Sequence, residues 1–163
     1  MNWLTNLLSV RTRENLSLRW FGLTRIPLLF YVGVRVVEVT PERLIARIPL
    51  RRRTKNHLGS MYFGALFIGA DVAPGAYAMY LIRQQRVPIS MVFKDFQAEF
   101  LKRAEGDVHF ICNHGKEIAE LVAQAAASDQ RVERQVEVIA TVPTLSDEPV
   151  ARFKLTLSLK KRA

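Results

Sequence analysis

The sequence predicts an α+β fold in which a largely antiparallel sheet curls around one long apolar helix. Strand-like segments outnumber helical ones and mostly occur as pairs joined by short turns. Residues 61–83 show no polar face until Tyr80, and a helix that is apolar all round must be buried on most sides. The chain has 163 residues, of which 49% are hydrophobic, enough for one domain with a core. We therefore expect the sheet to cover most of the helix and a second subunit to cover its remaining face.

The cysteine and histidine content limits the kinds of site that this chain can build. Cys112 is the only cysteine, so neither an intrachain disulfide nor a four-cysteine zinc site can form, and we interpret it as a core residue. His57, His109 and His114 lack the i, i+4 spacing of a helical zinc site. We expect no metal and no separate cofactor.

Residues 1–31 are predicted to form an N-terminal helical extension, and residues 32–163 a single main domain. Trp3, Leu4, Leu7 and Leu8 fit one helical face, and "RENLSLRWFG" fits a second helix ending near Gly22. Two interpretations stay open, because the extension can cap the core or lie on a membrane surface, as its basic flanks permit. The first residues do not resemble a secretory signal. No run of 18 apolar residues exists, so we expect no transmembrane helix and a cytoplasmic protein.

The two segments that follow predict a β-hairpin. "VGVRVVEV" and "RLIARIPL" are rich in β-formers and are joined by "TPE", with proline in the turn. In the second segment apolar residues alternate with others, which indicates one buried face. In the long helix after this hairpin, Pro74 cannot donate a backbone hydrogen bond, so we expect a kink or loosening there.

The second half of the chain predicts four more strands and one more helix. In "PISMVFKDFQAEF" the alternation changes phase, which predicts a bulge near Lys94–Asp95. "RAEGD" is predicted to turn the chain back into the strand "DVHFICN". "GKEIAELVAQAAAS" is predicted to be helical. "QRVERQVEVIATV" and "VARFKLTLSLKK" are predicted as long strands on either side of the turn "PTLSDEP".

Asp71 is a lone carboxylate inside the most apolar segment of the chain. Carboxylates are rarely buried without a partner or a task. Asp71 can therefore be a functional acid, or a structural acid that bonds to Tyr62, Tyr77 or the backbone of a partner subunit.

Three features together resemble the hotdog fold of acyl-CoA thioesterases. They are "NHLGSMYFGALFIGAD" at the start of the long helix, "KDFQAEFLKRAEGDV" in the next strand and turn, and the closing pair of long strands. The small thioesterases of phenylacetate degradation are similar, and an uncharacterised bacterial hotdog family is more similar still. The resemblance covers roughly residues 32–161 and implies a hotdog domain that pairs with a second subunit.

The resemblance also implies a site. Asn56 stands at the family's asparagine position and Asp71, fifteen residues later, at the position of its catalytic carboxylate. Gly64 is kept, whereas Tyr62 and Phe63 stand where the family has histidine and glycine. Asp71 would then be the general base or the nucleophile, Asn56 would orient the water or thioester, and Tyr62 could donate to the thioester or lie in a dimer interface. The amides of Phe63 and Gly64, at a helix start, would stabilise the oxyanion.

The remaining candidates are expected to contact the substrate. His57 and Gly59 lie in the loop before the helix, and Phe67 on the helix is expected to line an acyl channel with Leu66 and Ile68. The basic run is expected to meet the phosphates of coenzyme A through Arg51, Arg52, Arg53 and Lys55. Ordinary structural roles stay open: a loop histidine for His57, a cap or loop contact for Asn56, and a solvated strand end for the basic run.

These observations predict a thioesterase that acts on acyl-CoA or acyl carrier protein, with coenzyme A present only as part of the substrate. The alternative is a hotdog protein that binds acyl-CoA or fatty acid without hydrolysing it. The net charge of +9 would also attract nucleic acid, but no motif that reads nucleic acid is visible, so none is expected as a partner. We expect a homo-oligomer, either a dimer or a dimer of dimers.

Overall fold

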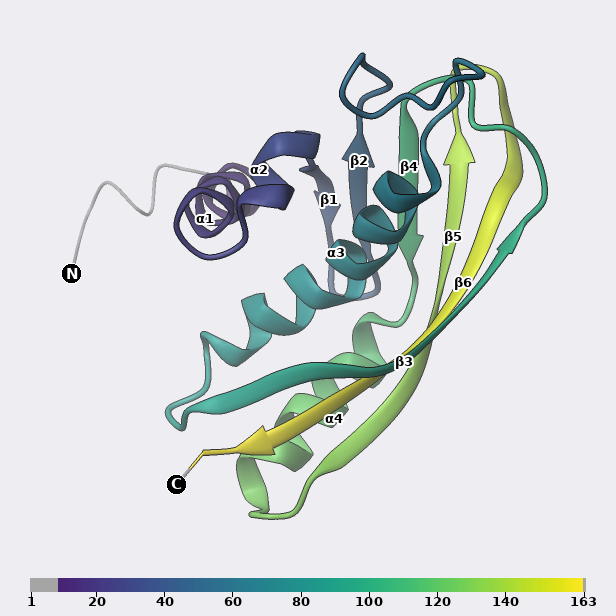
Figure 1. Ribbon diagram of the computed structural model, residues 1–163. Coiled ribbons are helices and arrows are strands. Elements are labelled where there is room, and N and C mark those ends of the chain that lie inside the picture. The colour runs from purple at the N-terminus through teal and green to yellow at the C-terminus, as the bar shows by residue number, and fades with distance from the viewer. Residues whose placement is uncertain (1–8, 163) are drawn as a thin grey trace.

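The computed structural model describes residues 9–162, and the expected helical face of Trp3, Leu4, Leu7 and Leu8 lies outside them. The described chain forms an α+β structure of helices and one antiparallel sheet (Figure 1). Its helices are α1 (Val10–Thr24), α2 (Pro27–Val32), α3 (Phe63–Ile82) and α4 (Gly115–Ala127). Its strands are β1 (Arg35–Val39), β2 (Leu44–Ile48), β3 (Ile89–Phe100), β4 (Val108–Cys112), β5 (Val132–Val142) and β6 (Ser146–Lys161).

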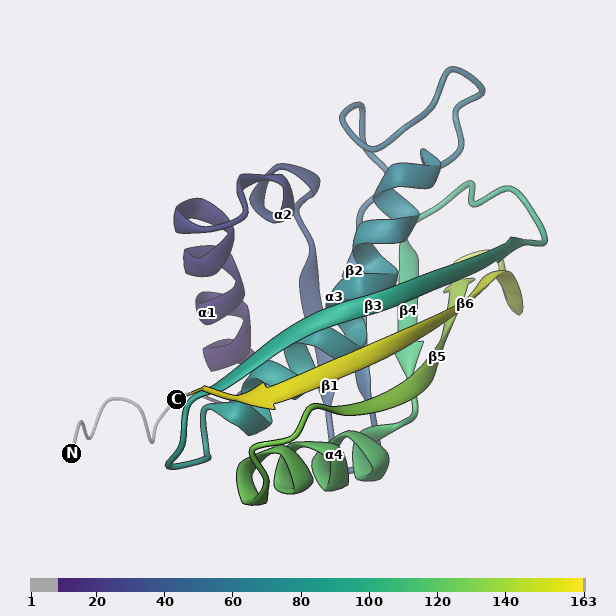
Figure 2. The same ribbon diagram turned by 60° about the horizontal axis from the view of Figure 1, so that its bottom comes forward.

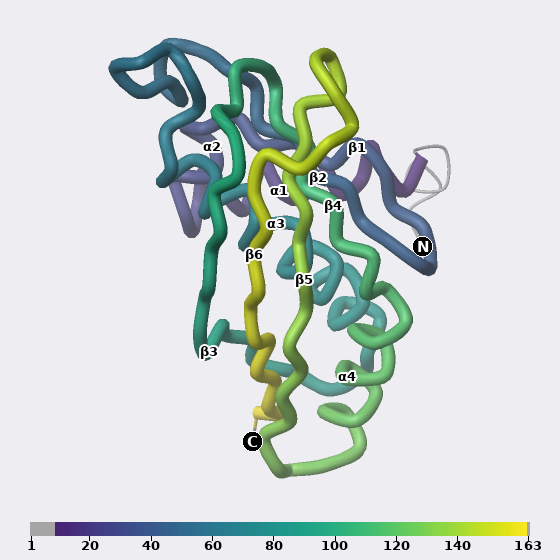
Figure 3. Tube along the Cα trace, turned by 90° about the vertical axis from the view of Figure 1, so that its right-hand side faces the viewer, coloured from purple at the N-terminus to yellow at the C-terminus, as the bar shows by residue number. Residues whose placement is uncertain are grey.

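The sheet has the strand order β1-β2-β4-β5-β6-β3 and curls around α3, which lies along its concave side (Figures 1 and 2). Figure 3 views the outer face of the sheet, where β3, β6, β5 and β4 follow one another. This arrangement confirms the predicted fold class. It leaves β1 and β3 as the two edges of the sheet.

The central helix α3 is buried because it has almost no polar side chains. Small residues bring it close to the sheet, and a Cβ on Gly69 would stand 2.1 Å from the Phe110 ring of β4. By length and apolarity α3 would suffice to span a membrane, yet 56% of its most apolar window is buried inside the protein. Packing in the core accounts for that apolarity. The helix continues through Pro74, which lies inside its bounds and is itself buried.

Strand β3 confirms one prediction and corrects another. Its register against β6 shifts between Phe93 and Phe96, which is the bulge that the phase change predicts. The predicted turn "RAEGD", however, does not return the chain beside β3. β4 pairs instead with β2 and β5, while β3 pairs with β6. Residues 101–107 therefore carry the chain from one edge of the sheet to its middle.

The N-terminal helices lie beside β1 at one side of the molecule (Figure 1). Ser9 caps α1 by accepting from the Thr12 amide at 3.3 Å. Asn15 of α1 donates to the carbonyl of Val36 at 2.8 Å and accepts from the Val36 amide, also at 2.8 Å. The Asn15 side chain thus forms the two hydrogen bonds with Val36 that a neighbouring strand would form, and it occupies part of the β1 edge. Glu14 of α1, which is buried, forms an ion pair with Arg83 just beyond α3.

Helix α4 covers the lower part of α3 beside β5 (Figures 1 and 2). Its buried stripe consists of Ile118, Leu121, Val122 and Ala125, with the helical spacing that the sequence predicts. Cys112, at the end of β4, is 1% exposed, as expected for a core residue. Burial raises the pKa of its thiol to about 11, so the thiol is unreactive near neutral pH.

Candidate functional site

Asp71 lies in the wall of an apolar pocket of about 450 Å³. The pocket is bounded by the C-terminal half of α3, by the first residues of β3 and by α1. Its wall is formed by Glu14, Ser17, Leu18, Phe21, Ile26, Leu29, Asp71, Val72, Gly75, Ala76, Met79, Ile82, Arg83, Ile89, Met91, Phe93 and Arg162. The helical extension is thus part of the pocket that holds the candidate acid.

The Asp71 carboxylate has no hydrogen bond or ion pair to any residue in the range 9–162. The Tyr77 hydroxyl, from one of the two tyrosines considered as partners, donates instead to the carbonyl of Pro41 at 3.0 Å. The Tyr62 side chain is 48% exposed and forms no hydrogen bond with the Asp71 carboxylate. Burial raises the pKa of Asp71 from 3.8 to about 6. A carboxyl group in that range exchanges protons near neutral pH, as a general base must.

The start of α3 offers the second half of the expected chemistry. The carbonyl of Tyr62 accepts from the amides of Ala65 at 2.9 Å and Leu66 at 3.2 Å. The amides of Phe63 and Gly64 precede these in the first turn, where backbone donors lack partners within the helix. The Tyr62 ring lies over this turn, because a Cβ on Gly64 would be 2.6 Å from its Cε1 atom. The half-exposed Tyr62 side chain therefore packs against Gly64, beside the expected oxyanion donors.

The structure does not bring Asp71 and these amides together within one chain. Seven residues separate Gly64 from Asp71 along α3, which corresponds to about 10 Å. One thioester group cannot contact both ends of this interval.

Asn56 organises the loop before α3. Its side-chain nitrogen donates to the Ser60 hydroxyl at 3.0 Å, and its side-chain oxygen accepts from the Leu58 amide at 2.9 Å. These bonds match the loop role that the sequence left open for Asn56. His57 and Gly59 are exposed at the tip of this loop, where Gly59 has a φ of 84°.

The basic run divides into two parts. Arg51 and Arg53 line a cleft of about 120 Å³ between α1, α2 and the end of β2. Arg52 and Lys55 are exposed and lie outside that cleft's wall. The predicted phosphate contacts are thus not on one surface.

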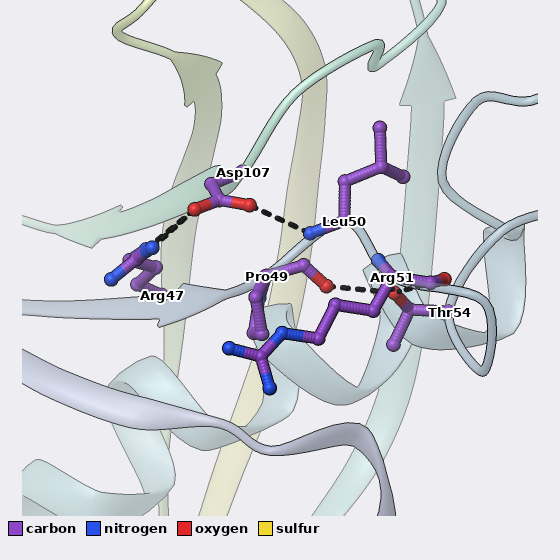
Figure 4. Close-up of polar contacts among 6 residues, drawn as sticks. All are labelled: Arg47, Pro49, Leu50, Arg51, Thr54 and Asp107. Carbon is purple, nitrogen blue, oxygen red and sulfur yellow. Dashed lines mark hydrogen bonds and ion pairs between the residues drawn. The ribbon is translucent and has the colours of Figure 1, made fainter.

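Two polar side chains hold the backbone of this region in place (Figure 4). Asp107 pairs with Arg47 and accepts from the Leu50 amide at 2.8 Å. Thr54, 1% exposed, donates to the carbonyl of Pro49 at 2.7 Å and accepts from the Arg51 amide at 2.8 Å. Thr54 engages only the backbone of Arg51, and no hydrogen bond joins the Arg51 guanidinium to the other residues drawn (Figure 4).

Phe67 belongs to an aromatic cluster and not to the pocket of Asp71. Its ring stacks on Phe96 with centroids 4.4 Å apart and meets Phe153 edge-on at 6.1 Å. Phe63 and Phe100 extend the cluster. Leu66 and Ile68 are likewise absent from the wall of the Asp71 pocket.

Sequence reasoning missed the contribution of α1 to the pocket and to the sheet edge. Glu14, Asn15 and Arg83 read as ordinary polar residues of helix surfaces, because their partners are far away in the sequence. The one available signal is that Glu14 is the only acid before Glu38 in a strongly basic stretch. Between residues 9 and 162 no group of three or more His, Cys, Asp or Glu side chains could hold a metal ion.

The curved antiparallel sheet, the central helix in its concave side and the strand order define a hotdog-fold protein. Within this class, the chain belongs to the family described as a domain of unknown function (DUF4442), whose model matches residues 16–159. No curated protein sequence is significantly similar to the chain.

Several solved structures share the fold. A protein of unknown function from Chlorobaculum tepidum is 14% identical, with a TM-score of 0.79 over 93% of this chain and 97% of that one. A probable thioesterase from Pseudomonas aeruginosa is 23% identical, with a TM-score of 0.70 over 90% of this chain and 95% of that one. A thioesterase from Haemophilus influenzae is 13% identical, with a TM-score of 0.68 over 94% and 92% of the two chains. At these identities the likeness establishes the fold.

Proposed function

We propose that this protein hydrolyses thioesters of acyl-coenzyme A or acyl carrier protein, as a cytoplasmic homodimer. The observation that carries the proposal is Asp71, an unpartnered carboxyl in an apolar pocket, with its pKa raised to about 6. Hotdog structures that are described as thioesterases support the same reaction class. Coenzyme A enters as part of the substrate.

In this reaction the Asp71 carboxylate acts as a general base. It takes one proton from a water molecule, whose oxygen attacks the carbonyl carbon of the thioester. The carbon–sulfur bond then breaks, and the proton passes to the leaving thiolate. Direct attack by the Asp71 carboxylate, followed by hydrolysis of the resulting anhydride, is the covalent variant of the same role.

The negative charge on the thioester oxygen would be stabilised by the amides of Phe63 and Gly64 of the partner subunit. Preorganised backbone donors of this kind contribute about 3–4 kcal/mol to the transition state. Access to them requires the Tyr62 ring to swing away from Gly64. Tyr62 is 48% exposed, so its rotation displaces little packed structure.

The two edges of the sheet favour one way of forming the dimer. α1 occupies the β1 edge through Asn15, whereas β3 has a neighbour on one side only. β3 also exposes Val92 (51% exposed) and Phe100 (50% exposed). A long open edge with exposed apolar side chains is a surface that pairs with another strand. Pairing of β3 with its copy would bring the two α3 helices close together.

Binding without hydrolysis is the second candidate, and the position of the Tyr62 ring is the observation that favours it. A ring that stayed over Gly64 would block the oxyanion donors while leaving the apolar pocket open. Such a protein would bind acyl-CoA tightly and release no thiol over hours.

The test is thiol release across a panel of acyl-CoA chain lengths, with wild type beside Asp71→Asn. We expect hydrolysis by the wild type and a loss of at least about 100-fold in Asp71→Asn, because the substitution removes the base. Asp147→Asn, at an exposed position beside the β5–β6 turn, is the matched control and should keep full activity. Full activity in Asp71→Asn would refute the role of this carboxylate, and acyl-CoA binding without turnover would establish the second candidate.

A further inference from the structure

Helix α1 carries an apolar stripe on the side that faces away from the protein. Leu16, Trp20 and Leu23 are 56%, 71% and 55% exposed, and their spacing of four and three residues places them on one face. Arg13 lies three residues before Leu16, and Arg19 lies four before Leu23, so arginines border the stripe. The opposite face of α1 packs on the core through Leu18 and Phe21.

Helix α2, which packs against α1 at Gly22, exposes further apolar side chains. Leu28 is 54% exposed, Phe30 is 40% exposed and Tyr31 is 55% exposed. The guanidinium of Arg19 lies over the Phe30 ring at 5.7 Å, and that of Arg53 over the Tyr31 ring at 5.8 Å. Apolar and cationic groups are therefore interleaved across α1, α2 and the neighbouring loop.

The cleft beneath α2 concentrates positive charge. Its wall contains Arg19, Arg35, Arg47, Arg51 and Arg53 around a volume of about 120 Å³. Of these, Arg47 pairs with Asp107, and the other four form no ion pair with residues 9–162. Such a cleft suits a phosphate group, since guanidinium groups bind phosphate oxygens in a fork geometry.

The charge of the sequence around α1 has the same sign. From residue 9 to residue 35 the basic residues are Arg11, Arg13, Arg19, Arg25 and Arg35. The one acid in this stretch is Glu14, which is buried and paired with Arg83. No exposed negative charge from this stretch opposes an anionic surface.

We propose that α1 and α2 dock this protein on an anionic phospholipid membrane. Leu16, Trp20 and Leu23 insert among the acyl chains, while the arginine-lined cleft takes a headgroup phosphate. A helix with an apolar face that includes tryptophan, bordered by arginine, lies in the interface of a bilayer. Nucleic acid or a free phosphate would satisfy the arginines but would leave the apolar stripe in water. A lipid surface satisfies both features at once.

The geometry connects this surface to the pocket of Asp71. Leu18 and Leu29 contribute to the wall of the arginine cleft and also to the wall of the apolar pocket. Docking through α1 and α2 would hold that pocket next to the membrane. The docking proposal does not depend on hydrolysis, because its test measures binding alone.

The first experiment is co-sedimentation of the full chain with neutral phosphatidylcholine vesicles and with vesicles containing about 30% phosphatidylglycerol. We expect binding to the anionic vesicles, weak binding to the neutral ones, and weakening with rising salt. Equal binding to both compositions, or none to either, would overturn the proposal. Diphosphate binding that depends on Arg19 and Arg53, without any binding to the anionic vesicles, would assign the cleft to a free phosphate and would also overturn the proposal.

Matched variants separate the stripe and the cleft from general properties of the chain. Arg19→Gln/Arg53→Gln should lower the vesicle partition coefficient roughly 10- to 30-fold. Arg86→Gln/Arg103→Gln, at exposed positions elsewhere, removes the same charge and should change it less than threefold. Leu16→Ser/Trp20→Ser should abolish binding, whereas Leu145→Ser at the β5–β6 turn should not. Equal effects of test and control variants would contradict the assignment.

Two further readouts address the occupant of the stripe. Trp3→Phe leaves Trp20 as the sole tryptophan, whose emission should shift to the blue with anionic vesicles and be quenched by brominated acyl chains. If Leu16→Ser/Trp20→Ser instead reduces the oligomer size on light scattering and Trp20 emission ignores vesicles, the stripe is a subunit interface and the proposal is wrong.

Discussion

At the scale of single residues, the position of Asp71 has a cost that other acids in the chain do not share. Its half-buried carboxyl lies in an apolar pocket without a hydrogen-bond donor from residues 9–162, so the hydration that the charged form loses there is not replaced. Ionisation is therefore disfavoured, and the pKa rises to about 6. The folded state accepts this cost at neutral pH, as is expected where a group is kept for function.

The raised pKa of Asp71 makes the stability of the folded chain depend on pH. Because the pKa of Asp71 is higher in the folded than in the unfolded chain, the folded state loses stability as pH rises from about 4 to 6. Above pH 6 the deficit stays constant at about 3 kcal/mol. Asp71→Asn should thus be more stable than wild type by up to about 3 kcal/mol at pH 8 and nearly equal at pH 4. Urea denaturation at both pH values measures this.

Hydrolysis should follow the same titration. A base works only when ionised, so kcat/KM for acyl-CoA should rise with pH and reach half its plateau near pH 6, the pKa of Asp71 in the free protein. The control for the denaturation experiment on Asp71→Asn is Asp147→Asn, at an exposed aspartate outside β3. A gain in Asp71→Asn that is the same at pH 4 and pH 8 would contradict the assignment of burial as the cause.

Much of the residue-level prediction came from one short segment, and its failures have a common physical origin. Asp71 and the amides of the first helical turn could be located because helix position alone places them. The Tyr62 ring over Gly64 could not be foreseen, since it depends on which rotamer a half-exposed side chain adopts. The loop bonds of Asn56 were one of two open alternatives, because asparagine suits both a loop and a ligand contact.

At the scale of elements, α3 depends on close approach to the sheet. Gly69 lies under the Phe110 ring of β4, where no other side chain fits without movement. Gly75, six residues along the same helix, has ordinary space around it, since a Cβ there would be 3.6 Å from the Phe93 ring. The two glycines form a natural pair for testing what positions the helix.

Gly69→Ala should lower the free energy of unfolding by about 1–3 kcal/mol, because the added methyl group collides with a fully buried ring. Gly75→Ala should raise it by about 0.5–1 kcal/mol through better helix propensity. Urea denaturation of both variants measures the contrast. Phe110→Leu should partly suppress the cost of Gly69→Ala, and a double variant that shows simple additivity would argue against this contact.

The elements themselves were largely predictable, whereas one connection was not. Apolar alternation placed the strands, and the phase change between Phe93 and Phe96 located the β3 bulge. The turn "RAEGD" indicated a reversal of the chain but carried no information about the neighbour of the next strand. Pairing of β4 with β2 and β5 is decided by which apolar faces pack on α3, a property of the whole sheet.

At the scale of the whole molecule, the proposed reaction requires two copies of the chain. Asp71 and the first-turn amides of α3 are about 10 Å apart along one helix, too far apart to serve one thioester. In the proposed dimer with twofold symmetry, each site would take the acid from one subunit and the amides from the other. A site shared in this way can be detected by mixing two inactive variants and measuring the activity of the heterodimers.

Phe63→Pro removes one oxyanion donor with little disturbance, since proline is tolerated in the first helical turn and Tyr62 is already extended, with a ψ of 137°. It should lower kcat roughly 100-fold, whereas Phe63→Ala, which keeps the amide, should cost far less. Random heterodimers of Phe63→Pro with Asp71→Asn should recover roughly a quarter of wild-type activity, because half the dimers hold one complete site.

The control is a mixture of Asp71→Asn with the Asp71→Asn/Phe63→Pro double variant, in which no complete site can form. Tagged subunits and light scattering show whether heterodimers are present. Heterodimers that form without recovered activity would contradict the shared site.

Helices α1 and α2 form one wall of the Asp71 pocket but contribute no strand to the sheet. Within the described chain, their ties to the rest are the bonds of Asn15 to Val36, the Glu14–Arg83 ion pair, the Arg53 guanidinium over the Tyr31 ring, and apolar packing. Evolution can therefore exchange this segment, and with it the volume available to an acyl group, while every strand pair stays in place. For the same reason, exchanging the N-terminal segment between homologues is a route to change the length of acyl chain that the pocket accepts.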